Sequence, residues 1–187
     1  MRSIIPLFAL ALGISAPAIA TELIPVPAFR SIELHGGGQV TLVPGSAQRV
    51  TILAGSSAYT SFRVDRDGRL EIDACNERCP HQYDLQIRIE SPRVPAVAIH
   101  GGGTIRAAGG FAPERQLAAA VNGGGTIDLR AVDAVSVAAA VNGGGDIFVR
   151  PRSTLSAAVN GGGDIRYLGN PQVSMAVRGG GDVRQGN

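Results

Sequence analysis

The chain has 187 residues and a formal net charge of +2, and only 4% of its residues are aromatic, with no tryptophan. So small a charge argues against nucleic acid or an anionic lipid surface as a partner held by bulk electrostatics. The shortage of rings excludes a core built on large aromatic side chains, so aliphatic side chains and backbone ladders must supply the stability.

The first 20 residues have the pattern of a secretory signal, which is expected to be removed. Arg2 supplies the positive charge, an apolar run follows, and Ala18-Ile19-Ala20 fits the small-x-small cleavage rule. The apolar run is too short to span a bilayer comfortably, and no second long one follows, so no membrane span is expected after cleavage. The protein is therefore expected to be exported, to the periplasm or to the cell surface and beyond.

The first half of the mature chain reads as short strands. Residues 21–28 carry two prolines and are expected to form an extended lead-in. From Phe29 onward, apolar and polar residues alternate with period two, and residues 50–54, 62–64 and 70–72 are further strands. Residues 65–68 predict a hairpin turn with Gly68 in the left-handed conformation. The alternation predicts inward side chains at Ile32, Leu34, Val40, Leu42, Leu85, Ile87 and Ile89.

A glycine triplet followed by a polar residue and an Ile or Val occurs six times. The last four intervals between triplets are 22, 20, 18 and 18 residues, and a period near 20 is typical of stacked coils. Each triplet is expected to form a corner, because glycine tolerates positive φ and lets two backbones approach closely. The triplets begin at Gly36, Gly101, Gly123, Gly143, Gly161 and Gly179.

The residues that flank the triplets predict two inward ladders of aliphatic side chains. Residues 116–121 and 134–141 are rich in Ala, but their alternation favours strands over helices. If successive coils stack about 4.8 Å apart, equivalent residues lie directly above one another. The ladder before the triplets is Val121, Val141, Val159 and Val177, and the ladder after them is Ile105, Ile127, Ile147, Ile165 and Val183.

The repeated VNGGGDI resembles the GSGDI-type repeat of the bacterial head GIN domain family, also called the auto-transporter adhesin head domain. The upstream segments FRSIELHG, GRLEI and IHGGGTI fit as well, so the resemblance runs from about Phe29 to Gln185. It implies an all-β fold: a right-handed β-helix or solenoid-like stack of short strands with glycine-triplet corners and a β-hairpin in its N-terminal part. We expect one such domain over residues 29–187, with the strongest repeats in 94–187.

Three aspartates that follow successive triplets, Asp146, Asp164 and Asp182, have two interpretations. They could form a Ca²⁺ ladder like that of glycine-rich β-rolls, but the second half of each 18-residue repeat lacks the ligands such a roll needs. The favoured interpretation is that each caps its glycine corner by accepting backbone N–H bonds, with Arg150, Arg166 and Arg184 neutralising the stack. No cofactor is predicted, and Ca²⁺ stays as an alternative.

Asn122, Asn142 and Asn160 precede three triplets and form a second polar ladder, with His100 before them and Arg178 after. Stacked amides can hydrogen-bond along the row. This structural ladder is favoured, and a sugar-binding strip is the functional alternative.

Cys75 and Cys79 are the only cysteines, and in an exported protein they favour a disulfide that closes a tight loop. The alternative is a metal site that adds His81, although C-x3-C-x-H supplies only three ligands without zinc-finger spacing. His35 and His100 each precede a triplet, which favours a structural role at the corner.

These patterns predict a non-catalytic, adhesin-like envelope or extracellular module that presents a repetitive polar face to a glycan, a surface or a protein partner. The alternatives are an enzyme that acts on polysaccharide through Asp128, Asp146 and Asp164, or a purely structural envelope component. The last coil, residues 177–186, would leave an exposed strand edge, which favours self-association or partner docking.

Overall fold

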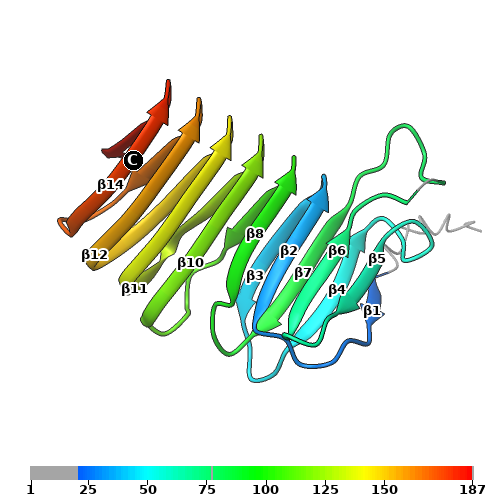
Figure 1. Ribbon diagram of the computed structural model, residues 1–187. Coiled ribbons are helices and arrows are strands. Elements are labelled where there is room, and N and C mark those ends of the chain that lie inside the picture. The colour runs from blue at the N-terminus through cyan, green and yellow to red at the C-terminus, as the bar shows by residue number, and fades with distance from the viewer. Residues whose placement is uncertain (1–20, 77, 187) are drawn as a thin grey trace, which may run out of the picture.

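Figure 1 shows a computed structural model of the protein, which describes residues 21–76 and 78–186. These residues form fifteen strands and no helix, so the all-β prediction is confirmed. The predicted signal, residues 1–20, lies outside the described residues. None of the described segments is a helix of the length and hydropathy that a membrane crossing requires.

The strands are short at the N-terminal side and longest in the middle of the repeat region. They are β1 (Glu22–Ile24), β2 (Ser31–Gly36), β3 (Gln39–Pro44), β4 (Arg49–Ala54), β5 (Ser61–Val64), β6 (Arg69–Asp73), β7 (Gln86–Ser91), β8 (Ala96–Gly101), β9 (Thr104–Ala107), β10 (Glu114–Gly123), β11 (Thr126–Gly143), β12 (Asp146–Gly161), β13 (Asp164–Tyr167), β14 (Gln172–Gly179) and β15 (Asp182–Gln185).

The strands form two rows, and within each row the pairing is parallel. The first row runs β6, β2, β8, β10, the second halves of β11 and β12, and β14 (Figure 1). The second row runs β7, β3, β9, the first halves of β11 and β12, β13 and β15. Because β11 and β12 pass from one row to the other, all fifteen strands belong to one hydrogen-bonded sheet.

Antiparallel strands complete both rows at the N-terminal side. β5 pairs with β6 through the predicted hairpin, whose turn is held by Asp65 Oδ1 accepting bonds from the N–H groups of Asp67 and Arg69 at 2.9 Å each. Gly68 has the predicted positive φ, +74°. β4 pairs with β7, and β1 pairs with β4, so the expected extended lead-in contributes a strand of its own.

The two predicted aliphatic ladders are present and in register. Val121, Val141, Val159 and Val177 are paired in succession, as are Ile105, Ile127, Ile147, Ile165 and Val183. All of these side chains are buried except Val177, which is 41% exposed. The prediction of a buried Val177 was wrong because β14 is paired only with β12, so its other side is open within the described chain. Self-association through this edge stays a prediction.

The glycine triplets bring the backbones of successive repeats into direct contact. Gly143 has a φ of +126°, and a Cβ at this position would overlap the carbonyl oxygen of Gly123. The N–H of Gly144 donates to the same Gly123 oxygen at 2.9 Å, and the N–H of Asp146 donates to Gly125 O at 3.0 Å. The corner backbone is therefore hydrogen-bonded from one repeat to the next. The distance between the backbones is so short that only glycine fits at Gly143.

A matched pair of glycines tests this close approach. A Cβ on Gly163 would overlap Gly145 O and approach Val141 Cγ1 at 2.7 Å, whereas a Cβ on the adjacent Gly162 meets no atom within 4 Å. We expect Gly163→Ala to lower the free energy of unfolding by roughly 2–3 kcal/mol because the backbones must separate. Gly162→Ala should change it by less than about 1 kcal/mol. Urea unfolding measures both, and equal effects would contradict a packed corner.

Candidate functional site

A row of polar side chains lies immediately before the glycine corners, one on each strand of the first row. We call it the corner row; its members are His35, His100, Asn122, Asn142, Asn160 and Arg178, which are paired in register. Asn142 Nδ2 donates to Asn122 Oδ1 at 3.0 Å, and Asn122 Nδ2 lies 3.4 Å from His100 Nδ1. Within the described chain one amide–amide bond links the row, between Asn122 and Asn142, and Asn160 is in register but makes no such bond to Asn142. The three amides are exposed to solvent.

Small side chains form the surface beside the corner row. The outward positions of β10, β11, β12 and β14 carry in-register columns of Ala, Ser, Thr and Gln. Two hollows of about 750 and 500 Å³ lie on this surface, which we call the small-residue face. Residues at these outward positions that line the hollows include Gln116, Ala118, Ser136, Ala138, Thr154, Ser156 and Ser174. This face is broad, shallow and mostly apolar.

The predicted aspartate ladder lies on the other side of the corners. Asp146, Asp164 and Asp182 are in register, as expected, and continue a column that contains Thr104 and Thr126. Asp164 Oδ2 lies 3.2 Å from a guanidinium nitrogen of Arg166 and 3.8 Å from one of Arg184. Within the described chain, arginines rather than corner N–H groups are the partners of Asp164.

Arg150 does not neutralise this ladder as the sequence suggested. Arg150, five residues after Gly145, lies opposite Asp133 of β11, and its guanidinium group is 3.9 Å from the Asp133 carboxylate. Arg152 contacts the same carboxylate at 2.6 Å. The expected partner was wrong because the register of β12 on β11 shifts between Asp128 and Asp133. The drop in the triplet interval from 20 to 18 residues requires such a shift but does not show where it falls.

A cluster that sequence reasoning missed surrounds Phe148 on the second row. Asp128 accepts two bonds from Arg130, at 2.8 and 3.0 Å, and the Arg130 guanidinium carbon lies 4.7 Å from the centre of the Phe148 ring. These hydrogen bonds hold the pKa of the Asp128 carboxyl below its usual range. A glycosidase general acid needs a raised pKa, so the lowered pKa of Asp128 argues against that role.

The carboxylate of Glu114 is buried, and its negative charge is paired with Arg93. The side chain of Glu114 is 5% exposed, and its oxygens accept bonds from the N–H of Val94 at 3.1 Å and from Arg93 at 2.7 Å. These contacts tie β10 to the loop before β8. Glu114 is therefore a structural ion-pair partner.

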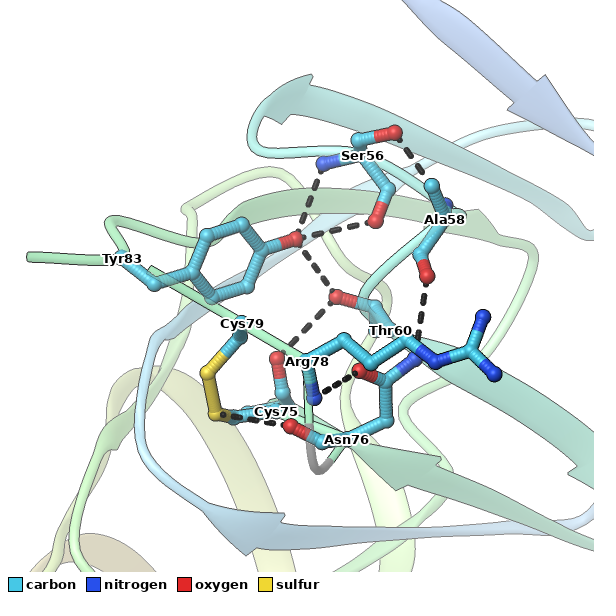
Figure 2. The surroundings of a disulfide bond; sticks show 9 residues. Ser56, Ala58, Thr60, Cys75, Asn76, Arg78, Cys79 and Tyr83 are labelled. Atoms are coloured by element: carbon cyan, nitrogen blue, oxygen red, sulfur yellow. Dashed lines mark hydrogen bonds between the residues drawn. A yellow bond between two sulfur atoms is a disulfide. The ribbon is translucent and has the colours of Figure 1, made fainter. Parts of the chain in front are cut away.

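Cys75 and Cys79 form the predicted disulfide, with their Cα atoms 5.6 Å apart (Figure 2). Asn76 Nδ2 donates to Ala58 O at 2.9 Å, and the Tyr83 hydroxyl lies 2.8 Å from both Ser56 N and Thr60 Oγ1. The metal site suggested for these cysteines with His81 is wrong, because the two sulfurs are bonded to each other.

One group of His and acidic side chains in the described chain has ligand atoms close enough together for a metal ion. It comprises Glu33, His35 and His100. The group lies on the corner row at the end opposite Arg178. Asp146, Asp164 and Asp182, the proposed Ca²⁺ ladder, are not part of it.

The Asp128–Arg130 pair predicts a pH-dependent contribution to stability. Because the folded pKa of Asp128 is lowered, the contribution is present above the unfolded pKa near 4 and is lost as the pH falls through the folded pKa. Asp128→Asn should lower the free energy of unfolding at pH 7 by about 1 kcal/mol. The difference should shrink below about pH 4. Urea unfolding across pH tests this, with the exposed Asp67→Asn as control, and a pH-independent difference would contradict it.

Comparisons with known proteins agree with the all-β fold described above. The chain matches the family model described as "Putative auto-transporter adhesin, head GIN domain" over residues 28–115 and 96–171. No curated protein matches the chain. A solved structure titled as a putative adhesin from Bacteroides fragilis is 17% identical, with a TM-score of 0.51 over 91% of this chain and 98% of that one.

Two further solved structures come from Parabacteroides. One, titled as a putative adhesin from Parabacteroides merdae, is 17% identical with a TM-score of 0.40 and covers 90% of this chain and 96% of that one. The other, titled as a putative lipid binding protein from Parabacteroides distasonis, is 15% identical with a TM-score of 0.39 and the same coverage. The Bacteroides likeness supports the fold, and the family model covers more than half of the chain. This chain therefore belongs to the head GIN domain family.

Proposed function

We propose that this protein is a non-catalytic, exported binding module of the adhesin type, which holds a glycan chain along the corner row and the small-residue face. The observation that carries the proposal is the in-register row of Asn122, Asn142 and Asn160 beside the two hollows. Family membership supports the adhesin class and export from the cytoplasm.

The coils are proposed to wind as a right-handed β-solenoid. Two rows of parallel strands joined at successive glycine corners support this winding, since parallel crossover connections are right-handed in nearly all known proteins. Such a stack repeats the same surface groups at the strand spacing, about 4.8 Å. A repetitive surface of this kind suits a repetitive ligand.

The chemistry of the corner row favours a glycan. Each exposed amide offers both a donor and an acceptor, which matches the hydroxyl groups of a sugar. The Ala and Ser columns carry no long side chains that would block a chain laid against them. The low net charge gives no electrostatic preference for a polyanion.

The surroundings of the carboxylates support a non-catalytic role over the polysaccharide-cleaving alternative. Asp128 and Asp164 each contact arginine, and the pKa of Asp128 is lowered by its hydrogen bonds with Arg130. A hydrolase needs one carboxyl kept protonated and a second carboxylate across the scissile bond. The ion pairs oppose the first requirement.

A glycan array probed with the purified protein tests the proposal. Replacing Asn122, Asn142 and Asn160 together by Ala should weaken retention of any bound glycan more than tenfold, because each lost hydrogen bond costs about 1 kcal/mol. Arg66→Ala, in the hairpin turn at the opposite end of β6 from the corner row, is the control and should bind normally. Equal binding by both variants would overturn the assignment of the face, and capture of proteins but no glycan would overturn the ligand class.

Product analysis of the retained glycan separates binding from hydrolysis. The wild-type protein should release no shortened fragments over long incubation, and the double variant Asp146→Asn with Asp164→Asn should bind as well as wild type. Fragments that disappear in the double variant would show that the polysaccharide-cleaving alternative is correct.

A further inference from the structure

Two histidines and a glutamate lie together at one end of the corner row. His35 on β2 and His100 on β8 are paired in register, and their rings stack with centroids 4.8 Å apart at an interplanar angle of 9°. Glu33 lies two residues before His35, on the same outward side of β2, since Ile32 and Leu34 point into the core. Parallel strands in register thus bring together residues 65 positions apart.

The carboxylate of Glu33 points toward both rings. Glu33 Oε2 is 3.6 Å from His35 Nε2 and 3.8 Å from His100 Nε2, and one ligand atom from each residue lies within 4.8 Å of the others. In a tetrahedral zinc site with bonds near 2.0–2.1 Å, neighbouring ligand atoms are about 3.3–3.5 Å apart. The three ligand atoms are thus near this spacing, but the lone pairs of two stacked rings run parallel, so both rings must turn out of the stack for each Nε2 to face one ion.

The cluster of Glu33, His35 and His100 is open to solvent at its two rings and is held at its carboxylate by a neighbouring arginine. The second oxygen of Glu33 is held by Arg69 at 3.2 Å, which fixes the carboxylate but adds a positive charge beside the site. Ala98, paired with Glu33 on β8, carries only a methyl group and so leaves space beside the carboxylate. His35 and His100 are 37% and 38% exposed, so an ion can reach them from solvent.

Asn122 supplies an outer partner for one ligand. It contacts Nδ1 of His100, the ring nitrogen that would not bind the ion. A 180° flip of the Asn122 and Asn142 amides together keeps the bond between them and lets Asn122 accept the N–H that Nδ1 carries when Nε2 is metal-bound. Such outer contacts fix the tautomer and ring orientation of histidine ligands.

We propose that Glu33, His35 and His100 bind a divalent transition-metal ion, for which Zn²⁺ is the probe. Two imidazoles and one carboxylate are a zinc ligand set that leaves a fourth position open. Imidazole nitrogen also discriminates against Ca²⁺, which prefers oxygen ligands. The smaller hollow reaches Glu33 and Ala98, so the open position borders the small-residue face. His35 and His100 also belong to the corner row, but the metal proposal does not rest on glycan binding and is tested by metal binding alone.

Isothermal titration of untagged, disulfide-intact protein with Zn²⁺ tests the proposal. We expect one ion per chain at micromolar affinity, reduced at least tenfold by His35→Gln and by His100→Gln, and reduced also by Glu33→Gln. His81→Gln removes the third histidine, which lies exposed in the loop beyond the disulfide, and should leave the affinity unchanged. Ca²⁺ at the same concentrations should give no heat that depends on His35 or His100.

Two results of the titration would overturn the site. One is no saturable Zn²⁺ binding at millimolar ion, and the other is binding that survives His35→Gln and His100→Gln. Thermal unfolding in chelator separates ligand loss from misfolding, because each variant should melt near the wild-type temperature there. A paramagnetic ion such as Ni²⁺ should broaden the ring signals of His35 and His100 before those of His81, and uniform broadening of all three would also contradict the proposal.

Discussion

The structure depends on the close approach of backbones at the glycine corners. At each corner, the N–H groups of one repeat donate to carbonyl oxygens of the preceding repeat, as Gly144 and Gly162 do to Gly123 and Gly143 at 2.9 Å. A Cβ at the first or third position of most triplets would overlap the preceding backbone or press against it. The corners therefore fix the register of one repeat on the next, and a slip by one residue would turn the aliphatic ladders toward solvent.

The register at the corners determines which side chains face solvent in stacked columns. Once Val121 and Val141 are stacked inward, the next residues, Asn122 and Asn142, must stack outward, and their amides lie at hydrogen-bond distance. The same rule aligns Asp146 with Asp164 beyond the corner. Like charges in such a column repel, and nearby arginines offset this repulsion. The polar rows are thus a direct consequence of the packing of the core.

Much of this arrangement could be predicted from the sequence, because the repeat carries its own register. The alternation around Val121 and Ile127, the glycine corners and the hairpin turn at Gly68 were all predicted correctly. What could not be predicted depends on pairing between distant segments. Both histidines precede a glycine triplet, which was visible, but their contact with Glu33 requires β2 and β8 to be neighbours. The Arg150–Asp133 pair depends on an irregular register, and the exposure of Val177 depends on its place at the end of a row.

Cross-linking between engineered cysteines measures the register most directly. Cysteines at Asn122 and Asn142 would have Cα atoms about 4.8 Å apart in an in-register parallel pair, within the range of about 4.4–6.8 Å that a disulfide spans. Cysteines at Ala120 and Asn142 would be displaced by two residues, at about 8 Å. We expect rapid oxidation of the first pair and little of the second in folded protein, because the corners hold the strands in register. Preferential oxidation of the second pair would contradict it.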